Sequence, residues 1–265
     1  MAHNQSSSFN DERVLCRLLI PKNNEKTPAA AELFFAALHG VYAASSKIQP
    51  VMSFEIVSIN KFIQFYFSVP KYLKEFVEGQ MYAQYPNVEI SEAEEYAGKS
   101  LANKQIIGAE LLTTKEDVYP IKTFESFEAD PLSGITSILS QLGQNDELWI
   151  QIVISPVTDS WQKKSISHVN AIKAGRNPGE SIFKSLLRGA WGVAPTIAGD
   201  KTASSVDISG PMQMALKGIE EKCTKLGFES KIRVISASPD LNTASQRLSG
   251  VIGAFKQYNT NNMNG

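Results

Sequence analysis

Two alternating segments joined by a two-residue turn constrain this fold more than any other feature of the sequence. Residues 54–59 and residues 62–69 both alternate apolar side chains with others, and the second segment stops at Pro70. Asn60-Lys61 lies between them, and such a pair is typical of the tight turn of a β-hairpin. The sequence therefore predicts two neighbouring antiparallel strands here.

Helices and strands flank this hairpin in an informative order. Before it, residues 14–20 form an apolar run stopped by Pro21, and helical spacing runs from Pro28 to about Ala44. After it, a helical pattern ends at Pro86 and a short strand candidate, 87–90, follows. The order strand, helix, strand, strand, helix, strand is that of the ferredoxin-like split β-α-β unit. We expect one such subdomain over residues 14–97.

The second half of the chain repeats much of this order. Strand candidates are residues 105–113, 118–127, 148–154 and 228–236, and helix candidates start after Asp130-Pro131 and span 212–226 and 241–255. The predicted fold class is therefore α+β, with two tandem ferredoxin-like (split β-α-β) subdomains, the second with a helical insert. The expected organisation is a polar disordered head at 1–13, subdomain 1 at 14–97, a linker at 98–104, subdomain 2 at 105–256 with the insert at about 159–210, and a flexible tail at 257–265.

Composition excludes several classes of protein. The chain has 265 residues, of which 43% are hydrophobic, and this is too apolar for a disordered chain. Its two cysteines cannot hold a disulfide scaffold together, and its net charge of −1 argues against a globally basic nucleic-acid binder. No signal peptide or apolar run of membrane-spanning length occurs, so we expect a cytoplasmic protein.

The insert carries an excess of basic residues and is the best candidate for an interaction surface. Its two predicted helices each have an apolar side, and Trp191 belongs to that of the second. The candidate surface residues are Lys163, Lys164, Lys173, Arg176, Lys184, Arg188 and Trp191. Helices packed on a sheet with lysines in water would show the same pattern. DNA phosphates, an anionic membrane surface and a partner subunit are the other partners that the pattern leaves open.

No set of residues in the sequence predicts catalysis. Gly98-Lys99-Ser100 resembles the end of a phosphate-binding loop, but Ala93 stands where the first glycine is needed. The glutamates 92, 94 and 95 are typical of a solvated strand end, and His39 of a hydrogen-bonded structural histidine. Three scattered histidines and two distant cysteines give no zinc spacing, so we expect no metal or cofactor in this chain.

Several longer segments resemble one protein family. They are Ser53 to Ser58, Ile63 to Tyr66, Phe76 to Ile90, Asp130 to Leu142, Gln151 to Pro156 and Arg247 to Asn264. Together they are similar to the N-terminal, pre-motor region of bacterial type IV secretion and conjugative-transfer ATPases of the coupling-protein and HerA-like class. The resemblance covers about residues 14–264.

The resemblance implies a domain without catalytic residues of its own. In that family an ATPase domain with a P-loop follows this region, and ATP and Mg²⁺ would bind only there. The implied role is assembly, anchoring or regulation of a DNA- or protein-translocating motor at the inner face of the cell membrane. The implied partners are the motor ATPase domain, secretion-complex subunits and further copies of the chain.

Two alternatives from other classes stay open at this point. The first is a stand-alone enzyme or ligand-binding protein with a pocket between the two subdomains, because pockets favour domain junctions. The second is a nucleic-acid binder that uses aromatic residues of the central strands, where Phe65, Tyr66 and Phe67 lie next to one another.

Overall fold

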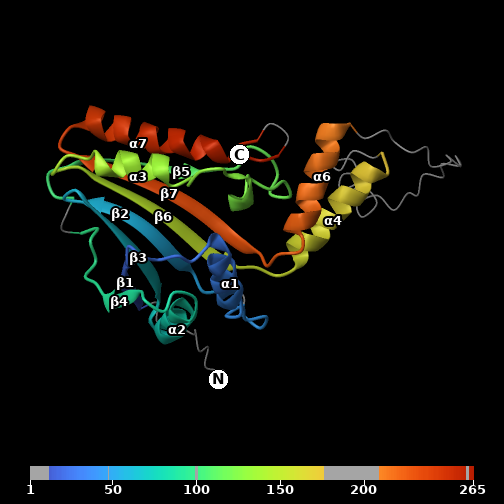
Figure 1. Cartoon of the computed structure of the whole chain (residues 1–265), viewed down its shortest axis with the longest axis horizontal. Coiled ribbons are helices and arrows are strands. Elements are labelled where there is room, and N and C mark those ends of the chain that lie inside the picture. Colours follow the sequence, from blue (N-terminus) through green and yellow to red (C-terminus); the bar gives the residue numbers. More distant parts are fainter. Residues whose placement is uncertain (1–11, 47, 99–100, 176–208, 261–262) are drawn as a thin grey trace, which may run out of the picture. The chain divides into compact units, whose positions relative to one another are not determined.

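The computed structural model describes residues 12–46, 48–98, 101–175, 209–260 and 263–265. These residues form an α+β structure with a seven-stranded antiparallel sheet and six α-helices, which confirms the predicted class at this level (Figure 1). The chain divides into two compact units. The first comprises residues 1–112, 124–157 and 227–257, and the second comprises 113–123, 158–226 and 258–265.

Both halves of the sequence contribute strands to the first unit. The strands are β1 (Arg13–Leu19), β2 (Met52–Ile59), β3 (Phe62–Pro70), β4 (Glu89–Glu92), β5 (Gln105–Leu111), β6 (Glu147–Pro156) and β7 (Phe228–Ser238). Its helices are α1 (Pro28–His39), α2 (Lys74–Gln84), α3 (Ser133–Ser140) and α7 (Leu241–Phe255), with short 3-10 turns at Lys71–Leu73, Phe124–Ser126 and Lys256–Tyr258.

The predicted hairpin is present as β2 and β3. Asn60 and Lys61 form its turn with φ angles of 52° and 67°. Two consecutive positive φ angles are the mark of a turn whose twist matches that of the strands it joins. Asparagine tolerates this conformation at little cost, whereas lysine adopts it rarely, so the turn is fixed by the strands as well as by its own sequence.

The seven strands form a single sheet in the order β4-β1-β3-β2-β6-β7-β5. The first half of the sequence supplies β4-β1-β3-β2 and the second half supplies β6-β7-β5. The two halves meet where β2 pairs antiparallel with β6, with Phe54 opposite Ile152 and Glu55 opposite Gln151. A continuous backbone ladder therefore joins the halves, and the sheet does not break at the predicted linker 98–104.

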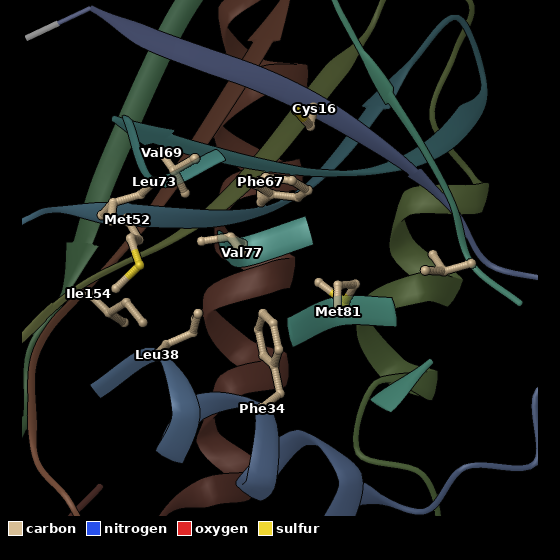
Figure 2. Packing of buried hydrophobic residues seen from close by; sticks show 11 residues of the cluster. Cys16, Phe34, Leu38, Met52, Phe67, Val69, Leu73, Val77, Met81 and Ile154 are labelled. Atoms are coloured by element: carbon tan, nitrogen blue, oxygen red, sulfur yellow. The ribbon is translucent and has the colours of Figure 1, made fainter. Parts of the chain in front are cut away.

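One face of the sheet is covered by helices. At the first-half end, Phe34 and Leu38 of α1 and Val77 of α2 point toward Phe67 and the side chains around it (Figure 2). α1 buries Phe34 and Leu38, and α2 buries Val77 and Met81, each pair four residues apart on one helix face. Burial of these side chains fixes which face of β1, β2 and β3 is the core.

The same face is covered at the other end by α3 and α7, which lie side by side (Figure 1). Ile135 and Leu139 of α3 and Leu248 of α7 pack against Leu148 and Ile150 of β6. Along β2 the residues on this face pass from the first cluster to the second: Phe54 belongs to one and Ile56 to the other. The four helices of the first unit thus cover one face.

The second unit contains α4 (Ser160–Lys173) and α6 (Gly210–Lys222). Val169 of α4 packs with Leu216 and Ile219 of α6 and with Val118. Near the C-terminus Asn264 is fully buried, and its amide donates to the carbonyls of residues 115, 116 and 119. The described residues 263–265 are therefore packed, whereas the polar sequence of 257–265 predicts a flexible tail.

The structure differs locally from the sequence prediction in both halves: α1 ends at His39 and not near Ala44, and further differences lie in the second half. Residues 118–127 do not form the predicted strand: they form turns and the 3-10 turn Phe124–Ser126. Val118 is buried because it packs between helices rather than in a ladder. The helix predicted to begin at Pro131 begins at Ser133, although the Asp130 carboxylate does accept from the backbone N–H of Leu132 at 2.8 Å.

Candidate functional site

A row of polar residues crosses the face of the sheet opposite the four helices of the first unit. Each residue is the Cα partner of the next, one from each strand: Ser91, Arg17, Tyr66, Glu55, Gln151, Arg233 and Glu110. Side chains directly opposite one another in a sheet are close enough to interact. Charged, hydroxyl and amide side chains follow one another along the row. Side chains of these kinds can take part in catalysis or ligand binding.

Glu55 is the buried centre of this row. Its carboxylate accepts a hydrogen bond from the Ser53 hydroxyl at 2.7 Å and another from the Tyr96 hydroxyl. The Gln151 amide donates in turn to the Tyr96 oxygen at 3.1 Å. Glu55 is only 6% exposed, so these donors take the place of water around its charge.

Aromatic rings cover the cluster. The Tyr96 ring lies 5.4 Å from the ring of Tyr66 and 4.8 Å from that of Trp149, between ring centroids. Burial, followed by the nearby charge of Glu55, raises the pKa of Tyr96. Burial also raises the pKa of Tyr66, and the nearby positive charge of Arg17 lowers it in part. Both phenols stay protonated at neutral pH, so Tyr96 acts here as a hydrogen-bond donor and not as a base.

A buried ion pair lies at the start of β6, four residues before Gln151. The Lys104 ammonium is 2.5 Å from the Glu147 carboxylate, whose side chain is 1% exposed. The Trp149 indole N–H donates to the other Glu147 oxygen at 3.0 Å. Lys104 follows the segment that contains Tyr96, so both clusters tie the chain between β4 and β5 to the sheet.

These clusters have the properties of anchors. Each carboxylate oxygen of Glu55 and Glu147 accepts a hydrogen bond from a side chain of the protein itself, as is usual for buried polar groups. Catalytic acids and bases need access to a reacting group. The contacts of Tyr96 with Glu55 and of Lys104 with Glu147 hold these two residues on the sheet.

A groove of about 450 Å³ opens where β1 and β3 separate. Their ladder ends at the pair Leu18 and Phe65. Beyond it the groove is lined by Arg17, Leu18, Leu19, Ile20, Phe62, Ile63, Gln64 and Phe65. Phe62 is 69% exposed, and Leu19 and Ile20 are each 48% exposed. Apolar side chains gathered in this way, with Arg17 and Gln64 beside them, are typical of a surface that binds a partner.

A second cavity, of about 540 Å³, is polar. It is lined in part by two surface ion pairs, Lys71 with Glu12 at 2.9 Å and Lys74 with Glu92 at 2.5 Å. The hydrogen bond from Lys74 lowers the pKa of Glu92. Glu92 is therefore part of an ion pair at a strand end, in agreement with its interpretation as a solvated residue.

The basic insert lies only partly within the described residues. Lys163 and Lys164 are exposed on α4, and Lys173 pairs with Glu220 of α6 at 2.5 Å. The other candidates, Arg176, Lys184, Arg188 and Trp191, lie outside the described residues. The structure thus places three of the seven residues, Lys163, Lys164 and Lys173, on the surface of α4.

The structure also describes the surroundings of His39 and of the aromatic residues on the central strands. The His39 ring N–H donates to the Val157 carbonyl at 3.0 Å, which confirms its structural role. Tyr66 is covered by Tyr96, and Phe67 is fully buried, so neither is an exposed aromatic of the kind a nucleic-acid-binding sheet needs. Within the described ranges, no three His, Cys, Asp or Glu side chains are grouped to hold a metal ion, and no helix has both the length and the apolarity to cross a bilayer.

The groove and the Glu55 cluster are absent from the sequence predictions. Leu19-Ile20 ahead of Pro21, and Phe62 directly after a turn, are apolar residues at strand ends, and that position is the signal that could have revealed the groove. Glu55 within an alternating strand is the corresponding signal for the cluster, since a charged residue there faces away from the core. Its partner Tyr96 is distant in sequence and could not be predicted from spacing.

Comparisons with known proteins identify a family but no activity. None of the curated proteins compared with this chain matches it. A crystal structure of aclacinomycin oxidoreductase is similar at 8% identity and a TM-score of 0.38, covering 93% of this chain. This chain spans only 41% of that protein's length, and so low a similarity indicates neither a shared fold nor a shared function. The resemblance to type IV secretion ATPases stays a prediction. Residues 4–265 match the family described as a domain of unknown function, DUF8128, and the chain belongs to that family.

Proposed function

We propose that this chain is a non-catalytic accessory domain that helps to assemble a type IV secretion-like, DNA- or protein-translocating ATPase on the cytoplasmic side of the membrane. The proposal starts from the sequence resemblance over residues 14–264. The partner it implies is the motor ATPase domain, which would supply the P-loop, ATP and Mg²⁺. The role of this chain would be to present binding surfaces to that motor and to further secretion-complex subunits.

The strand order supports the ferredoxin-like part of this proposal. In the first half, β1, α1, β2, β3, α2 and β4 follow one another and pair in the order β4-β1-β3-β2. This is the order of a ferredoxin-like unit. In the second half, β5, α3, β6, β7 and α7 pair as β5-β7-β6, which is the same arrangement without a fourth strand. We therefore interpret the sheet as two ferredoxin-like repeats joined through their second strands.

The observation that carries the function is the exposed groove at the end of β1 and β3. Apolar side chains are exposed to water at Phe62, Leu19 and Ile20, which is unfavourable in free energy. A bound partner would cover this surface. Arg17 and Gln64 add polar groups that can orient a partner chain. Apolar anchors in a groove with polar neighbours are the usual energetic centre of a protein–protein interface.

The alternative of an enzyme with a pocket between the two halves has less support. The halves meet along the β2–β6 ladder, where main-chain pairing fills the junction. The two cavities described above are both lined by residues of the first half alone. No specific observation favours a small-molecule substrate.

The proposal is tested by binding between the purified chain and the motor ATPase encoded with it. We expect a complex in which Phe62→Asp and Ile20→Asp each weaken binding about tenfold or more, as loss of a central apolar anchor does. Leu33→Asp is the matched control, because Leu33 is 61% exposed on α1 and lines no part of the groove. Equal binding by all three variants, or ATP hydrolysis by this chain alone, would contradict the proposal.

A further inference from the structure

The outer edge of β5 is an open edge of the sheet. In the first half, β1 has β3 on one side and β4 on the other. Its counterpart in the second half, β5, has β7 on one side and no described strand on the other. After α7 the chain does not return to fill this position: the backbone of Lys122 bonds to Tyr258 instead, and that of Asn264 to Pro120. Among the described residues of the second half, no strand takes the place that β4 has in the first.

The composition of β5 suits it to accept another strand. Exposed edges are normally protected by lysine, proline, bulges or short length. Gln105–Leu111 has seven residues and contains neither lysine nor proline, and its one charged residue is Glu110. Among the described residues, no hydrogen bond is made to this strand beyond its ladder with β7. Ile106 is 52% exposed, and Leu112, just past the strand, is 78% exposed.

The opposite edge of the sheet is protected in the usual way. Strand β4 has only four residues, Glu89–Glu92, and Glu92 is held by Lys74 at 2.5 Å. A short edge with acidic side chains discourages pairing with another chain. The contrast between the two edges shows that the sheet offers one edge for pairing, and that edge is β5.

We propose that β5 pairs with β5 of a second copy, antiparallel and about a two-fold axis at Gly108. Gly108 is the midpoint of Gln105–Leu111, so this register uses the whole strand in both copies. A two-fold contact of a surface with itself is the commonest form of protein self-association. The inference rests on strand pairing alone and holds independently of the proposed motor partner.

The side chains of β5 fit this register on both faces. In this register Ile106 of each copy lies opposite Glu110 of the other copy, so the pair occurs twice about the axis. No like charges lie opposite one another. Glu110 is balanced within its own chain by Arg233, its partner on β7, and by Lys231 at 4.0 Å. On the helical face Ile107 lies opposite Ala109, both of which belong to the core under α3 and α7. The apolar layer of one copy would therefore continue into that of the other.

The experiment is sedimentation velocity of the full chain over a concentration series. We expect a monomer–dimer equilibrium that Ile106→Glu weakens about tenfold, because glutamates would then oppose Glu110 at two positions. Ile106→Lys is the matched control: it changes the same exposed side chain but places a lysine opposite Glu110, so dimerisation persists. The double variant Ile106→Glu with Glu110→Lys reverses the charges and restores the dimer.

Cross-linking tests the register. Directly opposite Cα atoms in antiparallel strands lie about 4.5–5.5 Å apart, within the span of a disulfide. In a Cys223→Ser background, Gly108→Cys should give a disulfide-linked dimer on mild oxidation. Leu112→Cys, which lies past the end of the paired strand, should not. A chain that is monomeric at every concentration, or a dimer in which Gly108→Cys cross-links no faster than Leu112→Cys, would overturn the proposal and leave this edge to a strand of another protein.

Discussion

The Tyr96 hydroxyl donates a hydrogen bond to the carboxylate of Glu55, and this contact fixes Tyr96 on the face of the sheet opposite the four helices of the first unit. Glu55 comes from the middle of β2, and Tyr96 comes from outside any strand. Because the carboxylate is buried, this donor and Ser53 supply the hydrogen bonds that water would otherwise make. The bond is therefore a link between a central strand and the chain that crosses it.

Removal of this hydroxyl should destabilise the protein measurably. Tyr96→Phe leaves one Glu55 oxygen without its donor in a buried site, and we expect a loss of about 1–3 kcal/mol in the free energy of unfolding. Tyr82→Phe, on an exposed tyrosine of α2, should change it by less than about 0.5 kcal/mol. Urea unfolding of both variants measures the difference, and equal stability of the two would contradict the role of the bond.

The Lys104–Glu147 pair should be far more sensitive than a surface pair. Lys104→Met leaves the buried Glu147 carboxylate without its counter-charge, and we expect a loss of about 3–5 kcal/mol. Lys71→Met breaks the exposed pair with Glu12 and should cost at most about 1 kcal/mol. Denaturant titrations compare the two variants. A small effect at Lys104 would mean that water reaches Glu147.

The thiol of Cys16 should make stability fall at alkaline pH. Burial, followed by the charge of Glu78, raises the pKa of Cys16 to about 11. An unfolded cysteine ionises near pH 9, so between about pH 9 and 11 the unfolded state loses the proton while the folded state keeps it. The stabilisation is complete below pH 9 and is lost as the pH rises, by about 3 kcal/mol in all.

The measurement is the free energy of unfolding against pH for the wild type and for Cys16→Ala. The variant should lack the part of the decline between pH 9 and 11 that Cys16 causes. Reaction with a thiol reagent gives an independent readout: Cys223, which is partly exposed, should react in the native protein, and Cys16 only after unfolding. Parallel pH profiles for the two proteins would rule out this contribution.

The turn of the hairpin offers a stabilising substitution. Lys61 has a φ of 67°, which glycine adopts without strain, and Asn-Gly is the preferred pair for such a turn. We expect Lys61→Gly to raise the melting temperature, with a gain of about 0.5–1 kcal/mol. Lys26→Gly, in a loop where φ is not positive, should give no gain, since it only adds freedom to the unfolded chain. A fall in melting temperature for Lys61→Gly would show that the positive φ of Lys61 does not lower the stability of the protein.

The first half of the fold could be predicted because its boundaries are encoded locally. Pro28 starts a helix, Asn60-Lys61 forms a turn and Pro70 ends a strand, and each acts through its own backbone geometry. In the second half the helix at Leu241–Phe255 was predicted to the residue for the same reason, with Asp240 accepting from the N–H of Thr243 as its cap.

The remainder depends on contacts between distant segments. Nothing near Glu55 or Gln151 in sequence indicates that their strands are neighbours, because edge pairing of β2 with β6 is decided by packing under the helices. Val118 is buried by α4 and α6 and not by a ladder, so the strand predicted over residues 118–127 does not form. The candidate site was missed for a related reason: exposure of Phe62 is a property of where β1 and β3 separate, and no local pattern reports it.

The connection between β6 and β7 has a narrow base. The Val157 N–H donates to the Gly227 carbonyl at 3.1 Å, and the Val157 carbonyl accepts from His39. Residues 158–226 therefore leave and re-enter the sheet unit at adjacent backbone positions. A segment attached in this way can lengthen, shrink or be exchanged during evolution without disturbing the strand register on either side, so we expect relatives to differ most in size at this point and to keep the sheet itself intact.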